Sequence, residues 1–236
     1  MDVKIKDWVV TPRIGKPIEV NALWINALHF MVKAASILEK SAEEYTEYLE
    51  KAEIGFQRFW NPSTGYCFDV LDTPEGNDPS LRTNQVIAIS LPHCPLSEDQ
   101  QRHIIDISAS KLLTSHGLRC LSPDASQYIG RYGGDQAKRD TAYHQGTVWA
   151  WLIGPFVSAH LKIYGDPKQA KSFLQPLLNQ LQSHCVGNIS EIFEGNAPFT
   201  PRGCFAQAWS VGELLRVWQE IISFEQALSS NTAMTG

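Results

Sequence analysis

The sequence contains carboxylates that could hydrolyse a glycosidic bond. This reaction needs one carboxyl group that donates a proton to the leaving oxygen and one ionised carboxylate. The polar segments offer Asp2, Glu19, Asp140, Glu191 and Glu194. Glu191 stands out because SEIFEG is a short segment with apolar neighbours between two predicted helices. Such surroundings would orient the carboxylate and partly remove it from water.

Aromatic and amide side chains in the same sequence suit the binding of a sugar. Aromatic faces pack on the C–H surfaces of sugar rings, and amides pair with hydroxyls. Such residues recur near the starts of predicted inner helices: Asn21, Trp24, Asn84, Gln145, Trp149, Trp151, Gln207 and Trp209. The four amides lie 63, 61 and 62 residues apart, which indicates stacked helical hairpins with amides around a cavity mouth. Alternatively, the tryptophans serve only as hydrophobic core.

Hydrophobic periodicity predicts the helices that would carry these side chains. The predicted helices lie near residues 19–39, 42–60, 81–91, 97–113, 142–164, 166–183 and 203–222. Those near 19–39, 81–91, 142–164 and 203–222 open with uncharged polar residues beside aromatics, and the third is apolar almost all round. A helix that is apolar on every side must be buried, so these four are predicted to be inner helices and the others outer. These seven helices make three and a half hairpins.

Composition and charge restrict the class of protein. The chain has 236 residues, 43% of them hydrophobic, and a formal charge of −5, as expected of a globular domain. This charge argues against nucleic acid as a partner. The sequence shows neither a signal peptide nor an apolar stretch long enough for a membrane. Five cysteines without a CxxC pair and scattered histidines predict a cytoplasmic protein without metal or cofactor.

Four segments of the sequence resemble a known family of enzymes. They are MDVKIKDWVVTPRIGKPIEVNALW, LRTNQ, YHQGTVWAWLIGPF and SEIFEGNAPFTPRGCFAQAWSVGELLR. They are similar, in the same order, to the C-terminal domain of bacterial and archaeal glycogen debranching enzymes of the amylo-α-1,6-glucosidase type. The resemblance runs from residue 1 to about 222. It implies an all-α fold, part of an (α/α)6 toroid of glucoamylase type, and inverting hydrolysis of α-1,6-linked glucose in a glycogen branch, limit dextrin or α-glucan oligosaccharide.

The resemblance also implies roles for individual residues. It places the general acid at Asp2 and the general base at Glu191, and an inverting pair stands roughly 6.5–9.5 Å apart to admit a water. Glu19 competes with Asp2 for the acid role because it is anchored at a predicted helix start. The matching positions for sugar-contacting or supporting residues are Arg13, Glu19, Asn21, Trp24, Arg82, Asn84, Tyr143, His144, Gln145, Trp149, Arg202, Gln207 and Trp209.

The start of the chain departs from the family's pattern. Met1 matches the methionine of a Trp-Met-Asp motif, which implies an N-terminally truncated chain whose missing half would be a partner. We expect residues 1–224 to be the C-terminal part of the glucosidase domain and residues 225–236 a loose polar tail. An acid at a frayed terminus loses most of its catalytic benefit, so the isolated chain is expected to have little activity. The alternatives are a non-catalytic carbohydrate-binding module and an (α/α) scaffold for protein partners.

Overall fold

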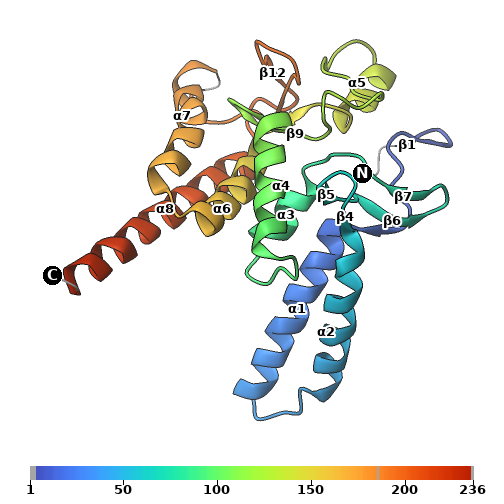
Figure 1. The fold of residues 1–236 in the computed structure, drawn as a ribbon. Coiled ribbons are helices and arrows are strands. Elements are labelled where there is room, and N and C mark those ends of the chain that lie inside the picture. The colour runs from blue at the N-terminus through green and yellow to red at the C-terminus, as the bar shows by residue number, and fades with distance from the viewer. Residues whose placement is uncertain (1–3, 185, 235–236) are drawn as a thin grey trace.

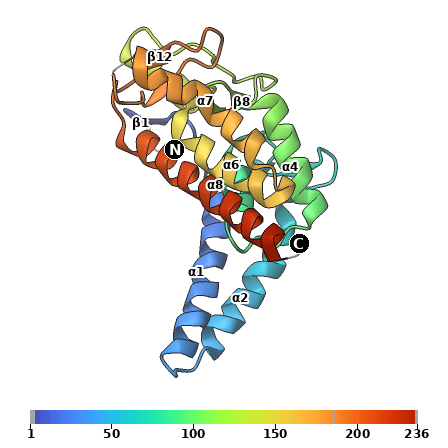
Figure 2. The ribbon, with the colours of Figure 1, turned by 90° about the vertical axis from the view of Figure 1, so that its left-hand side faces the viewer.

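An arc of inner helices organises the computed structural model, which describes residues 4–184 and 186–234, the last four by their backbone only. Its members in order are α1 (Ile18–Ile37), α3 (Asn84–Ser90), α6 (Ile153–Tyr164) and α8 (Ala208–Met234). Each helix contacts the next one along the arc (Figures 1 and 2). These four helices correspond to those that the sequence predicts to be inner helices, and α6 is the one that is buried on all sides. Within the described residues, no helix combines the length and hydropathy needed to cross a bilayer.

The outer helices cover this arc from one side. They are α2 (Glu43–Phe56), which the 3₁₀ turn η1 (Gln57–Phe59) extends, α4 (Glu98–Lys111) and α7 (Pro167–Ser183). Helix α2 packs on α1, α4 on α3 and α6, and α7 on α6 and α8. Ser97 and Gln100 form a capping box at the start of α4, and Asp166 accepts the Gln169 N–H at 2.9 Å before α7. These caps satisfy backbone donors that the first helical turn leaves unpaired.

Helix α6 lies at the centre of the core. Every residue from Ile153 to Leu161 is buried. The helix contacts α3, α4, α7 and α8, so all of its sides are covered. Burial of apolar area on this scale is the main favourable contribution to folding, at about 25 cal/mol per Å². Helix α6 is therefore apolar on nearly every side because it is buried on every side, as the sequence predicts.

Two predicted helices differ from the observed ones. The helix expected near 142–164 is divided into α5 (Gln136–Tyr143), strand β10 (Val148–Trp149), the 3₁₀ turn η2 (Ala150–Leu152) and α6. Gly146, with φ of 143°, interrupts the helix, and the β-branched residues after it favour extended backbone. At the other end, α8 continues to Met234, so the expectation of a loose tail from residue 225 is wrong for the described part. Lys171 of α7 pairs with Glu225, at the start of this extension, at 2.7 Å.

The all-α expectation also omits short antiparallel sheets, which gather at one end of the helices (Figure 1). A five-stranded sheet has the order β12 (Pro201–Arg202), β11 (Ile192–Phe193), β10, β9 (Gly117–Arg119) and β8 (Leu113–Thr114). A three-stranded sheet contains β3 (Lys16–Pro17), β6 (Val70–Thr73) and β7 (Gly76–Asp78). Two hairpins pair β1 (Lys4–Ile5) with β2 (Trp8–Val9), and β4 (Trp60–Asn61) with β5 (Tyr66–Cys67). Strands this short show no alternation of hydropathy, so periodicity cannot predict them.

Candidate active site

A pocket opens where α1, α3 and α8 approach strand β10. Its volume is about 280 Å³, close to the lower end of the range of small-molecule sites, about 300–1,000 Å³. Six of the predicted site residues line it: Arg13, Glu19, Asn84, His144, Trp149 and Trp209. Trp151 and Cys120 contribute further lining. Burial raises the pKa of the Cys120 thiol to about 11, so it is not ionised at neutral pH and is a poor nucleophile.

Aromatic rings form one wall of this pocket. The rings of His144 and Trp149 are parallel, with centroids 5.3 Å apart and an interplanar angle of 3°. The rings of Trp151 and Trp209 also stack, with centroids 5.5 Å apart. The rings of Trp149 and Trp209 are nearly perpendicular, with centroids 5.9 Å apart. Trp209 is half exposed, whereas Trp149 is buried. The wall therefore presents indole surface to the kind of ligand that packs on aromatic faces.

Behind the pocket lies Asp69, a buried carboxylate that is not among the predicted site residues. Its side chain is 1% exposed. Arg13 donates from Nε to Oδ2 at 2.8 Å and from Nη2 to Oδ1 at 3.1 Å. Asn84 donates to Oδ1 at 2.8 Å, and the Nε of Arg82 lies 3.8 Å from Oδ2. Burial raises the pKa of Asp69, while Arg13 and Arg82 act in the opposite direction.

Arg13 joins this buried carboxylate to Glu19 in the pocket. It donates from Nη1 to Oε1 of Glu19 at 2.5 Å and from Nη2 to Oε2 at 2.8 Å. Burial lowers the pKa of Arg13, but Glu19 and Asp69 outweigh this effect and raise it above the ordinary value. Both oxygens of Glu19 thus accept hydrogen bonds from a permanent cation. This arrangement fixes the carboxylate of Glu19 in one orientation, in which it could position a hydroxyl of a ligand.

A local signal in the sequence could have identified Asp69. It precedes Val70 and Leu71, two buried apolar residues of β6. An acidic residue within such a short apolar segment is rarely fully buried without a partner. The partner here is Arg13, 56 positions away in the sequence. That distance explains why local patterns do not reveal the pair.

Glu191 lies just before strand β11, and both of its carboxylate oxygens are held. The hydroxyl of Tyr143 donates to Oε1, and the backbone N–H of Cys204 donates to Oε2 at 2.8 Å. Gly203 has a positive φ of 66°, and a Cβ at that position would stand 2.5 Å from Oε2. Burial, followed by the hydrogen bond to Glu191, raises the pKa of Tyr143, which keeps this hydroxyl a donor. The ring centroids of Tyr143 and Trp149 are 4.7 Å apart. Because Tyr143 contacts both Glu191 and Trp149, Glu191 adjoins the aromatic wall.

The structure places only one of the four predicted amides in the pocket, namely Asn84. Asn21 instead donates to the Pro17 carbonyl, four residues earlier, at 2.7 Å. The side-chain oxygen of Gln145 accepts a hydrogen bond from Arg82 at 2.9 Å, and Gln207 does not line the pocket. The expectation that all four amides surround one cavity mouth is therefore wrong. Short-range hydrogen bonds to backbone and neighbouring side chains compete for these groups.

Other predicted site residues also lie outside the pocket. Arg82 is buried behind it and donates to the His144 carbonyl at 2.7 Å, which supports the lining from outside. Trp24 is exposed on α1. Arg202 pairs with Glu194 at 2.9 Å and lines a separate cavity. Asp2 lies outside the described residues.

Comparisons with known proteins agree on one kind of enzyme. Residues 1–216 match the family model described as amylo-alpha-1,6-glucosidase. The glycogen debranching enzyme of Saccharomyces cerevisiae is 25% identical over 264 aligned positions, which cover 89% of this chain and 17% of that protein. This chain therefore spans less than one fifth of the length of that curated relative.

Solved structures of glycosidases share the fold. The GH63 mannosylglycerate hydrolase from Thermus thermophilus, in complex with Tris and D-glycerate, matches with a TM-score of 0.64 and 14% identity, over 86% of this chain and 46% of that one. Neutral trehalase from Saccharomyces cerevisiae matches with a TM-score of 0.59 and 13% identity, over 89% of this chain and 38% of that one. At this identity the likeness shows the fold alone, and this chain covers less than half of either structure.

Proposed function

Because this chain belongs to the amylo-alpha-1,6-glucosidase family, and so to a class of glycoside hydrolases, we propose that it supplies one side of an active site that cleaves α-1,6-linked glucose from branches of glycogen or limit dextrin. The observation that carries the proposal is the position of Glu191. Its carboxylate is oriented by Tyr143 and Cys204 and adjoins a pocket with an aromatic wall. That combination suits a general base beside a bound sugar ring.

The proposed reaction is a single displacement with inversion at the anomeric carbon. Glu191 accepts a proton from a water molecule as the water attacks that carbon. Asp2 donates a proton to the departing glycosidic oxygen, so the bond to the leaving sugar breaks as the bond to water forms. Such a displacement requires the two carboxyl groups to stand roughly 6.5–9.5 Å apart, which leaves space for the water.

The pocket would bind the glucose residue that is released. The ring stacks on the indole surface of Trp149 and Trp209, while Glu19, Asn84 and His144 pair with its hydroxyls. Because Arg13 holds Glu19, we assign to Glu19 the orientation of a hydroxyl and to Asp2 the role of the acid. A sugar loses hydrogen bonds to water on binding, so each hydroxyl needs such a partner.

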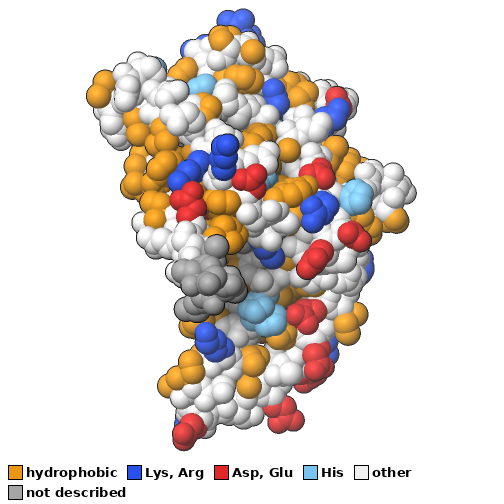
Figure 3. All heavy atoms as spheres, turned by 60° about the vertical axis from the view of Figure 1, so that its left-hand side comes forward, with side chains coloured by type: hydrophobic (Ala, Val, Ile, Leu, Met, Phe, Trp, Pro, Cys, Tyr) orange, Lys and Arg blue, Asp and Glu red, His pale blue; other side chains and the backbone are white. Residues whose placement is uncertain are grey.

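We propose that further helices complete this active site. Helix α1 carries an exposed apolar stripe at helical spacing, made of Val20, Leu23, Trp24, Phe30 and Ile37. Hydrophobic side chains interrupt the charged surface on this side of the molecule (Figure 3). A stripe of this kind on a helix at the end of an arc normally packs against a neighbour. The occupant that fits is the preceding part of the glycosidase fold, since this chain covers 46% of a neighbouring hydrolase.

The first prediction concerns the activity of the isolated chain. We expect it to release little or no glucose from isomaltose or limit dextrin, because the helices that we propose to complete the active site are not part of the isolated chain. Co-expression with a segment that supplies the preceding family helices should give one complex on size-exclusion and restore glucose release. Robust release by the isolated chain would show that no further helices are needed. A stable complex without any release would contradict the proposed glucosidase.

A further inference from the structure

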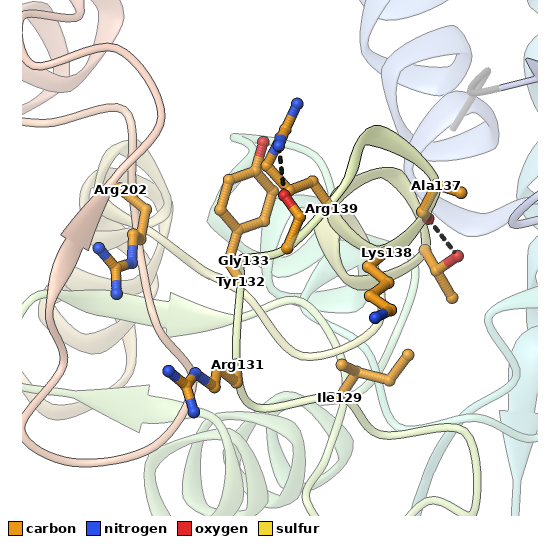
Figure 4. Close-up of a pocket in the computed structure, with 10 residues that line it drawn as sticks. Ile129, Arg131, Tyr132, Gly133, Ala137, Lys138, Arg139 and Arg202 are labelled. Atoms are coloured by element: carbon orange, nitrogen blue, oxygen red, sulfur yellow. Dashed lines mark hydrogen bonds between the residues drawn. The ribbon is translucent and has the colours of Figure 1, made fainter.

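A second and larger cavity lies between helix α5, the loop before it and strand β12 (Figure 4). Its volume is about 940 Å³. Four cationic side chains line it, Arg131, Lys138, Arg139 and Arg202, together with the aromatic ring of Tyr132. Among the residues that the structure describes, no carboxylate is part of the lining. The chain as a whole has a formal charge of −5, so this cluster differs from the rest of the molecule.

The cations around this cavity are only partly neutralised by the protein. Arg202 pairs with Glu194 at 2.9 Å. Arg139 turns back and donates to the Gly134 carbonyl at 2.5 Å, as Figure 4 shows. Within the described residues, Arg131 and Lys138 make no ion pair. Like charges held at the edge of one cavity repel each other, and an anion between them removes that repulsion.

We propose that this cavity binds the phosphate monoester of a phosphorylated sugar. A guanidinium group pairs with two phosphate oxygens at once, so Arg131 and Arg202, which lie on the same side of the cavity in Figure 4, suit a phosphate dianion. Lys138 lies on the other side of the cavity, where its ammonium group adds positive charge. The ring of Tyr132 supplies an aromatic surface for the attached sugar. The cavity is also large enough for more than the phosphate group itself.

The position of the cavity favours a sugar over other phosphorylated ligands. The ring of Tyr132 lies 5.9 Å from that of Tyr143, and the hydroxyl of Tyr143 donates to Glu191. A phosphorylated sugar in this cavity would therefore lie next to the carboxylate that we assign to hydrolysis. The ligand could be a free sugar phosphate or a phosphate ester on a glucan chain. Binding itself does not require hydrolysis, so the proposal can be tested independently of the proposed function.

The test is calorimetric titration of the full chain with glucose 6-phosphate, inorganic phosphate, phosphorylated maltotriose and glucose. We expect glucose 6-phosphate to bind with a Kd of about 1 mM or lower and inorganic phosphate to bind more weakly. Increasing NaCl from about 50 to about 500 mM should weaken both several-fold. Tighter binding of phosphorylated maltotriose would identify the glucan ester as the ligand, and the reverse order would identify the free sugar phosphate.

Two substitutions locate the binding in this cavity. Arg131→Ala should weaken the binding of glucose 6-phosphate about tenfold, since it removes a charge-assisted contact, and Lys138→Ala should weaken it about threefold, since it removes a nearby positive charge. Lys33→Ala, an equal charge change at a position on α1 far from this cavity in the sequence, should leave the Kd unchanged. The proposal is overturned if glucose 6-phosphate does not bind at about 10 mM. It is equally overturned if neither cavity substitution changes the affinity, or if Lys33→Ala weakens it to the same extent.

Discussion

Replacing Asp69 by alanine is expected to lower the free energy of unfolding by about 3–5 kcal/mol. The substitution leaves two buried guanidinium groups, Arg13 and Arg82, without the carboxylate that they share. It also removes the acceptor of Asn84. Arg82 then has no carboxylate partner and Arg13 keeps only Glu19. A buried charge that loses its partner costs more than the pair itself contributes, so the loss should exceed that of an ordinary surface substitution. Urea unfolding of the wild type and the variant measures the difference.

A matched control separates this effect from a general loss of negative charge. Asp124 pairs with Lys111 at 2.7 Å, but its side chain is mostly exposed. Asp124→Ala should change the free energy of unfolding by less than about 0.5 kcal/mol. Asp69→Asn keeps the shape of the side chain and should retain the fold while it weakens sugar binding, because Arg13 is held less firmly. If Asp69→Ala and Asp124→Ala destabilise the chain equally, the buried network does not have the role described.

The largest effect on activity is expected for Glu191→Gln. A carboxamide has nearly the shape of the carboxylate and still accepts the hydroxyl of Tyr143, but it cannot take a proton from water. In the complex that releases glucose, hydrolysis of isomaltose should fall by about 10³-fold or more. The affinity for the sugar should change little, because Glu191 is not part of the pocket lining. Initial rates and calorimetric titration measure the two quantities.

Glu194→Gln is the matched control, since Glu194 lies in the same segment and pairs with Arg202. We expect this variant to keep at least about a tenth of the wild-type rate, because its contact with Arg202 only supports the segment. Retention of a similar fraction by Glu191→Gln would exclude Glu191 as the base. A wild-type complex that binds isomaltose and never hydrolyses it would instead indicate a carbohydrate-binding module.

The helical scaffold could be predicted from the sequence because helices of this length repeat their hydrophobic pattern several times. Helix α6 is the clearest case, since its burial from Ile153 to Leu161 is visible as a nearly continuous apolar run. The strands of two to four residues contain too few positions for a pattern. They nevertheless position the site, because β6 follows Asp69 and β11 follows Glu191. Helix α8 extends beyond residue 224, where Glu225 pairs with Lys171 of α7, a contact that no local pattern contains.

The candidate site could be predicted in its residue types but only partly in its geometry. Asn84 and Trp209 line the pocket from the starts of α3 and α8, as predicted, whereas Trp149 lines it from strand β10. Asn21 and Gln145 were equally favoured by spacing, yet their amides are used by the Pro17 carbonyl and by Arg82. Hydrophobic periodicity predicts the position of a residue along a helix. The hydrogen-bond partner of its side chain depends on neighbours that are distant in the sequence.

The most direct test of the proposed site is a crystal structure, with bound isomaltose, of the chain in complex with the segment that supplies the preceding helices. We expect one glucose ring in the pocket between Arg13 and Trp209, with its hydroxyls paired to Glu19 and Asn84. The carboxyl groups of Asp2 and Glu191 should stand roughly 6.5–9.5 Å apart, on opposite sides of the glycosidic bond. If the sugar binds elsewhere, or if these two carboxyl groups lie on different faces of the molecule, the assignment as an inverting glucosidase is contradicted.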